Sequence, residues 1–288
     1  MVKTRGKNRN KKTILITLIL LGALILVSRP LLRKKPERAP QKPPAEKTPQ
    51  TKKKKIHRRE AEMPPAGSIA VIIDDVGYPV ETIEQFAGFS GKLTFSVIPF
   101  LAHSKEYADL FYRKGYEIML HIPMEPLNYP SDDPGFGAIF TGDTKSTVET
   151  KIQRMLDNVP HVRGANNHMG SRATQDFQLM TWALSALGKR NMFFIDSLTT
   201  PSSRAYEAAR SLGIDAAKRN IFLDNKDDYS EINTQFEKLK DIALKRGIAI
   251  GIGHIQSRHL VDVLNAQLPL LEKEHIILIF ASEAVGRN

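Results

Sequence analysis

From Ser68 to the end of the chain, short apolar runs rich in β-branched residues alternate with amphipathic stretches, and this alternation limits the fold most. The apolar runs, predicted to be strands, are 69–73, 93–98, 117–120, 162–166, 192–195, 217–223, 248–252 and 276–280. The amphipathic stretches, predicted to be helices, are 79–89, 103–114, 146–158, 175–189, 203–212, 230–246 and 257–273. This order predicts an α/β fold, a distorted (β/α) barrel of seven or eight strands. An open doubly wound sheet is the alternative.

The N-terminal quarter differs from the rest in charge. Residues 1–65 hold 19 Lys and Arg against 4 Asp and Glu, whereas residues 66–288 hold 23 against 27. The net charge of +11 therefore comes from the first quarter, and the mildly acidic remainder argues against a nucleic-acid partner. Because the chain has no cysteine, disulfides, cysteine-ligated zinc and a thiol nucleophile are excluded.

That quarter divides into three segments. Residues 1–12 are basic, and Thr13–Ser28 is an uncharged run of 16 residues without a small-x-small cleavage site after it. We predict a transmembrane signal anchor at 13–28, which makes the membrane a partner; a cleaved signal peptide and a buried core helix are the alternatives. Residues 29–65 contain eight of the 17 prolines and predict a disordered linker, either a spacer or a polybasic segment that binds anionic lipid or cell-wall polymer. Residues 66–288 are expected to form the catalytic domain.

Ionisable and amide residues directly follow five of the predicted strands. These residues are Asp74 and Asp75, His121, Asn166 to His168, Asp196, and His254. Because the carboxyl ends of parallel strands form the face that carries active sites, we expect these side chains to gather there. His121, His168 and one aspartate would supply three ligands to a divalent metal and leave a position for water. Since adjacent strand residues point to opposite sides, one aspartate of the pair is expected to face the centre squarely.

The other candidates keep two interpretations each. Glu125, in the irregular loop 123–144, is a supporting or substrate-binding residue or an exposed loop acid. Asn166 and Asn167 donate hydrogen bonds to a substrate or fix the loop, and Asp196 orients a partner or caps the next turn. His254 is a candidate proton donor, and the glycines before it would let a ligand approach the backbone.

With these residues in view, residues 66–285 resemble the divergent polysaccharide deacetylases, which are related to the nodulation-protein-B-type deacetylases of carbohydrate esterase family four. The resemblance rests on IIDDVG at 72–77, LHIPMEP at 120–126, GANNHMGS at 164–171, FIDS at 194–197 and IGH at 252–254. Members of that branch look like exported bacterial proteins. The resemblance therefore implies a domain in the periplasm or outside the cell, and the predicted signal anchor would hold it in the inner membrane.

The resemblance also implies roles for individual residues. In the wider family the first motif pairs a general base with a metal ligand, which suggests Asp74 as the base and Asp75 as the ligand. The second motif holds two histidine ligands, and here its positions are His121 and Glu125. We infer from chemistry and position that His168 replaces the second histidine.

The last motif of the wider family supplies the general acid, which suggests His254. Its arginine-containing motif is not clearly matched, although Arg163 and Arg172 are nearby.

These observations predict a metal-dependent hydrolase that removes N- or O-acetyl groups from an acetylated cell-envelope polysaccharide. Zinc or another divalent metal would be held by Asp75, His121 and His168. The main alternative is a non-catalytic glycan-binding or scaffold protein on the same barrel, which the altered second motif favours. A metal-dependent phosphoesterase is a weaker alternative, because the site face has no Gly-rich phosphate loop.

Overall fold

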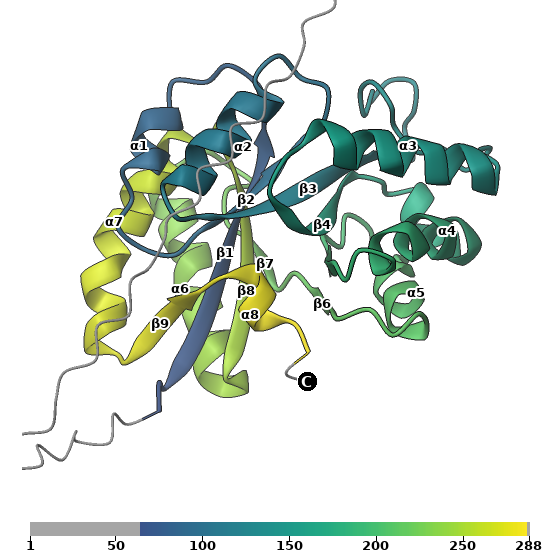
Figure 1. Cartoon of the computed structure of the whole chain (residues 1–288). Coiled ribbons are helices and arrows are strands. Elements are labelled where there is room, and N and C mark those ends of the chain that lie inside the picture. The colour runs from purple at the N-terminus through teal and green to yellow at the C-terminus, as the bar shows by residue number, and fades with distance from the viewer. Residues whose placement is uncertain (1–63, 287–288) are drawn as a thin grey trace, which may run out of the picture. The chain divides into compact units, whose positions relative to one another are not determined.

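The computed structural model describes residues 64–286, which form one nine-stranded sheet with helices around it (Figure 1). The strands are β1 (Gly67–Val76), β2 (Thr94–Val97), β3 (Glu117–Met124), β4 (Val162–Met169), β5 (Phe193–Asp196), β6 (Ala216–Lys218), β7 (Ile221–Phe222), β8 (Ile248–His254) and β9 (Ile276–Ile279). The helices are α1 (Ile83–Ala87), α2 (Ser104–Arg113), α3 (Lys145–Asn158), α4 (Phe177–Gly188), α5 (Ala205–Ser211), α6 (Tyr229–Arg246), α7 (Arg258–Lys273) and α8 (Ala281–Ala284).

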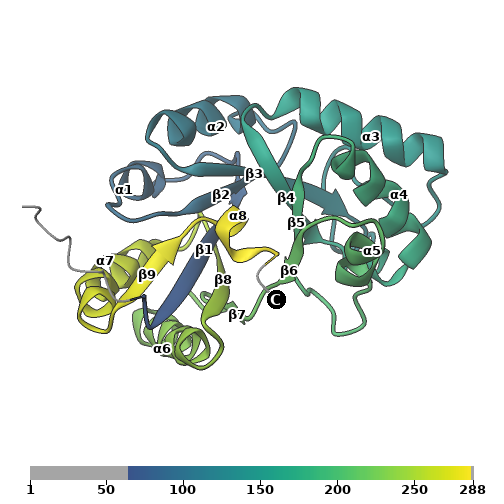
Figure 2. The same cartoon turned by 60° about the horizontal axis from the view of Figure 1, so that its bottom comes forward.

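The strands follow one another around the sheet in sequence order. All their pairings are parallel, and the order is β6-β5-β4-β3-β2-β1-β8-β7, with β9 beside the first half of β1. Figure 2 shows the curl of this sheet, with α1 to α7 on its outer side. A doubly wound sheet would reverse its strand order at a switch point. The fold is therefore a curled parallel α/β sheet, consistent with the expected (β/α) barrel.

The predicted strand 217–223 is wrong in one respect, because it is two short strands on opposite edges of the sheet. β6 pairs with β5 and β7 pairs with β8, and the two residues between them cross from one edge to the other. The backbone N–H of Arg219 donates to Asp196 O at 3.0 Å, and that of Asn220 donates to Ile250 O at 2.8 Å. This crossing explains why the structure has nine strands and not eight.

Two apolar cores lie on the two faces of the sheet. Along β1, Ile69, Val71 and Ile73 belong to the large core under the helices, whereas Ala70 and Ile72 belong to a smaller core inside the curl. Helix α8 also packs into this inner core. The buried side chain of Glu117 accepts a hydrogen bond from the backbone of Ser282 at 3.0 Å, which satisfies one free N–H at the start of α8.

The N-terminal predictions fall outside the described residues. This holds for the basic segment 1–12, the anchor 13–28 and the linker 29–65 except its last two residues. Within residues 64–286, none of the helices has the length and apolar character needed to cross a membrane.

Candidate metal centre

A β-bulge at the end of β1 turns two neighbouring aspartates to the same side. Ile73 pairs with Phe95 and Val76 with Val97, so β1 contains one residue more than β2 over this stretch. Asp75 adopts the left-handed backbone region, with φ of 62°, and this interrupts the strand alternation. The expectation that one aspartate faces the centre is therefore wrong. Asp74 Oδ2 lies 3.5 Å and Asp75 Oδ1 lies 3.3 Å from His121 Nε2.

Three donor atoms converge at the ends of β1, β3 and β4. Asp75 Oδ1 lies 3.0 Å from His168 Nδ1 and 3.3 Å from His121 Nε2, and the two histidine nitrogens are 3.3 Å apart. Ligands at about 2.0–2.2 Å from one tetrahedral zinc ion would be separated by about 3.3–3.5 Å. Asp75 Oδ1 is buried and has no hydrogen-bond partner, which fits an atom oriented toward a cation. In residues 64–286, these three side chains form the group suited to a metal ion.

The carboxylate of this group is ionised. Burial raises the pKa of Asp75, but the imidazoles of His121 and His168 outweigh burial and hold that pKa well below its usual range. An ionised carboxylate beside two imidazole nitrogens is an ordinary donor set for zinc.

Asn166 fixes both a donor and a neighbouring carboxylate. Its Nδ2 donates to the two carboxylate oxygens of Asp74, at 2.9 and 3.1 Å, and its Oδ1 lies 2.7 Å from His121 Nδ1. Because an ionised carboxylate accepts hydrogen bonds only, the amide nitrogen must face Asp74 and the amide oxygen must face His121. In its neutral form His121 therefore carries its proton on Nδ1 and directs the lone pair of Nε2 at the proposed metal position.

Asp74 is a buried carboxylate next to the three donors, with 2% of its surface exposed. Burial raises its pKa and the Asp75 charge adds to this rise, whereas His121, His254 and the hydrogen bond from Asn166 oppose it. The net effect is a raised pKa, which brings this carboxylate closer to the range in which a general base works near neutral pH.

His254 lies opposite Asp74 in the β1–β8 ladder and is held by an acid that the sequence analysis missed. Asp224 Oδ1 lies 2.9 Å from His254 Nδ1, and Asp224 Oδ2 accepts the backbone N–H of His254 at 2.7 Å. Burial disfavours the charged imidazole, but the hydrogen bond and the charge of Asp224 outweigh burial and raise the pKa of His254 to about 9. The available signal was that Asp224 directly follows the predicted strand 217–223.

Glu125 lies outside the donor group. Its Oε2 accepts hydrogen bonds from the backbone N–H and the hydroxyl of Thr141, both at 2.7 Å, and Arg172 Nε lies 3.6 Å from its Oε1. The side chain is mostly buried and ties the two ends of the loop after β3 together. The alternative of an exposed loop acid is therefore wrong, and a supporting or substrate-binding role stays a prediction.

Asn167 and Asp196 make contacts that fit the structural alternatives. Asn167 Oδ1 accepts the backbone N–H of Ser197 at 2.9 Å, which links the loops after β4 and β5. Asp196 Oδ2 accepts from the hydroxyl of Ser203 at 2.8 Å, just before α5. Of the two asparagines, Asn166 is the one whose side chain contacts the residues of the metal group.

The glycines before His254 face the helices and not a ligand, so that expectation was wrong. A Cβ atom on Gly253 would lie 2.4 Å from Leu260 in α7, and one on Gly251 would lie 2.6 Å from Leu239 in α6. A side chain at either position would have to displace a leucine, so the glycines let the helices pack closely against β8.

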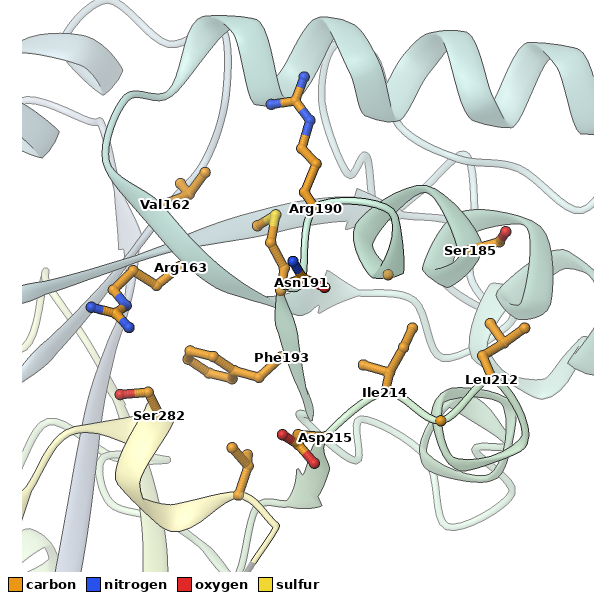
Figure 3. A pocket seen from close by; sticks show the side chains of 14 residues that line it. Val162, Arg163, Ser185, Arg190, Asn191, Phe193, Leu212, Ile214, Asp215 and Ser282 are labelled. Atoms are coloured by element: carbon orange, nitrogen blue, oxygen red, sulfur yellow. The ribbon is translucent and has the colours of Figure 1, made fainter.

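A cavity of about 660 Å³ lies at the amino ends of β4 and β5, away from the strand ends that carry the donors (Figure 3). Arg163, Arg190 and Asp215 line it, and none of the described residues around it belongs to the metal group. Arg163 therefore does not match the arginine-containing motif by position. Arg172 Nη2 donates to the backbone carbonyl of Leu127 at 3.0 Å, in the loop after β3.

Comparisons with known proteins give one family. Residues 71–285 match the family described as divergent polysaccharide deacetylase. The uncharacterized protein YibQ of Escherichia coli strain K12 is 33% identical over 190 residues, which are 66% of this chain and 59% of that protein. An uncharacterized protein of Haemophilus influenzae is 31% identical over 206 residues, 72% of each chain.

Among solved structures, the uncharacterized protein ATU2773 from Agrobacterium tumefaciens C58 is similar, with a TM-score of 0.72 and 19% identity. The similarity covers 77% of this chain and 90% of that one, and it shows the fold alone.

Proposed function

This chain belongs to the divergent polysaccharide deacetylase family, and we propose on that premise that it is a metal-dependent hydrolase which removes acetyl groups from a cell-envelope polysaccharide. The observation that carries the proposal is the convergence of Asp75, His121 and His168 at 3.0–3.3 Å, beside the buried carboxylate of Asp74. Metal-assisted hydrolysis requires metal ligands, a general base and a general acid. The three donors, the Asp74 carboxylate of raised pKa and the His254 imidazole of raised pKa could supply them.

Asp75, His121 and His168 would hold the cation, for which zinc suits the two nitrogens and one oxygen best. When bound, such a cation polarises a carbonyl and lowers the pKa of water. Asn166 contributes by keeping His121 in the tautomer that a metal ligand needs.

Two other side chains would move protons. Asp74, held in place by Asn166, would take a proton from the attacking water onto its carboxylate. His254 would give a proton from Nε2 to the leaving amine or hydroxyl, because Asp224 occupies its Nδ1. Asp224 acts through His254 and is a positioning residue.

The location is part of the same proposal. We place the domain in the periplasm or outside the cell, anchored in the inner membrane by residues 13–28. The support is the uncharged run flanked by basic residues.

The second candidate, a glycan-binding protein without turnover, is favoured by one observation. Glu125 stands where the wider family has its second histidine, and its Oε2 is engaged by Thr141.

The deciding experiment measures acetate released from N-acetylated and O-acetylated oligosaccharides by the zinc-loaded full-length chain. We expect release by the parent chain and none by Asp74→Asn, with metal content retained in both. Oligosaccharide binding by the parent without acetate release would replace the hydrolase with the binding protein.

A further inference from the structure

Arg219 is a partly buried cation that forms no direct ion pair with a carboxylate of residues 64–286. Its Nε donates to Ser197 O at 2.7 Å, and its Nη2 donates to Leu198 O at 3.0 Å. A guanidinium has five N–H donors, so three of them have no partner within residues 64–286. Nη1, which donates to neither carbonyl, is open to solvent, so a ligand has access to its N–H groups.

Two sets of contacts place this guanidinium beside the candidate site. Ser197, whose carbonyl binds Arg219, accepts through Oγ a hydrogen bond from the Asn166 amide that also holds Asp74. The Phe222 ring lies 3.6 Å from the guanidinium carbon, and the same ring stacks with His254 at 5.9 Å between centroids. Arg219 therefore flanks the site near the proposed base and the proposed acid. Burial lowers the pKa of Arg219, and the charges of Asp196 and Asp74 oppose that effect.

The free side of the guanidinium has a defined shape. The two carbonyls occupy the edge formed by Nε and Nη2, which leaves the edge formed by Nη1 and Nη2. Two parallel N–H groups on that edge match the two oxygens of a planar carboxylate. The stacking on Phe222 and the two carbonyls hold the group in place, so little side-chain freedom is lost on binding.

We propose that Arg219 is a carboxylate-binding subsite, and that the substrate is an acidic glycan with a sugar carboxylate close to the acetylated sugar. A partly desolvated guanidinium without a directly bonded carboxylate is costly, and the ligand would supply that partner. This inference rests on the proposed function and adds the class of polysaccharide.

Three N-acetylated tetrasaccharides test it. One contains N-acetylglucosamine alone, the second carries a lactyl ether carboxylate on alternate sugars, and the third alternates N-acetylglucosamine with glucuronate. The parent full-length chain should prefer one of the acidic probes over the neutral one by about tenfold in kcat/KM. The preferred acidic probe distinguishes a lactyl carboxylate from a uronate.

In Arg219→Gln the ratio of acidic to neutral kcat/KM should fall to about one. In Arg219→Lys this ratio should lie between those of the parent and Arg219→Gln, because lysine keeps the charge but lacks the two parallel N–H groups of the guanidinium. Arg163→Gln is the matched control, since it removes the same charge from an arginine at the amino ends of the strands, and its ratio should equal that of the parent. Should Arg219→Gln fail to fold, as circular dichroism would show, Arg219→Lys decides.

The inference is overturned if the parent shows no preference for either acidic probe, or if the ratio is the same in the parent and the Arg219 variants. Calorimetric binding of the three probes separates this result from a failure of the proposed function. If no probe releases acetate, a tighter Kd for an acidic probe that is lost in Arg219→Gln still supports the subsite.

Discussion

Replacing Asp224 by Asn should move the alkaline limit of the reaction. In the parent, Asp224 contacts His254 through both oxygens, at 2.9 and 2.7 Å, and the pKa of His254 is raised from 6.5 to about 9. Asparagine keeps the size of the side chain but removes the charge. The full difference corresponds to about 3 kcal/mol of favourable interaction with the imidazolium, which we reduce to about 1–2 kcal/mol because a third of the ring is exposed.

The assay is kcat/KM for acetate release between pH 6 and 10. As His254 must be protonated to act as the acid, we expect the alkaline limit of the parent near pH 9 and that of Asp224→Asn about 0.7–1.5 pH units lower. At pH 8.5 the variant should therefore be about two- to eightfold slower, and the gap should narrow toward pH 6. A bound divalent cation repels the imidazolium and lowers both limits, so the difference between the two proteins is the test.

The raised pKa of His254 should also make the free energy of unfolding depend on pH. Because the folded-state pKa of His254 is raised, protonation stabilises the fold fully below pH 6.5, and this contribution disappears as pH rises through about 9. Asp227→Asn is the matched control, since Asp227 accepts from Ser257 at 2.8 Å and caps α7. The reasoning is refuted if the alkaline limit of Asp224→Asn equals that of the parent, or if activity falls equally at every pH.

Three further changes test the architecture of the site, with metal content and denaturant unfolding as measurements. Asp75→Asn and Asp75→Ala should both lose the metal, but Ala should cost about 1 kcal/mol more, because asparagine tolerates the left-handed backbone; equal stabilities would contradict this. Gly253→Ala should destabilise by about 1–3 kcal/mol through contact with Leu260, whereas Gly142→Ala, with open space around it, should change stability by less than about 1 kcal/mol. Asn166→Leu should cost about 2–5 kcal/mol, since it leaves buried polar groups without partners; an unchanged unfolding midpoint would contradict the network.

The fold was predictable because buried parallel strands are near-continuous apolar runs. β1 and β8 were evident from Ile69–Ile73 and Ile248–Ile252 alone. The split of 217–223 was not predictable, because an apolar pattern does not show that Arg219 and Asn220 cross from one sheet edge to the other.

The candidate site was predictable where its residues directly follow predicted strands. His121, His168 and the aspartates follow strands, and the structure brings them together there; their roles in catalysis are proposals. The bulge at Asp75 was missed, because strand alternation carries no signal for one residue in the left-handed region. Asp224 was missed although it follows a predicted strand, since its partner His254 lies 30 residues further along the chain.

Metal content tests the central claim most directly. The full-length parent chain, His121→Ala and the control His161→Ala, which alters an exposed histidine paired with Asp109, are each loaded with zinc and measured by elemental analysis. We predict about one equivalent of zinc in the parent and in His161→Ala, and none in His121→Ala. Full occupancy in His121→Ala, or a parent that binds no zinc, nickel or manganese, would contradict a metal centre at these strand ends.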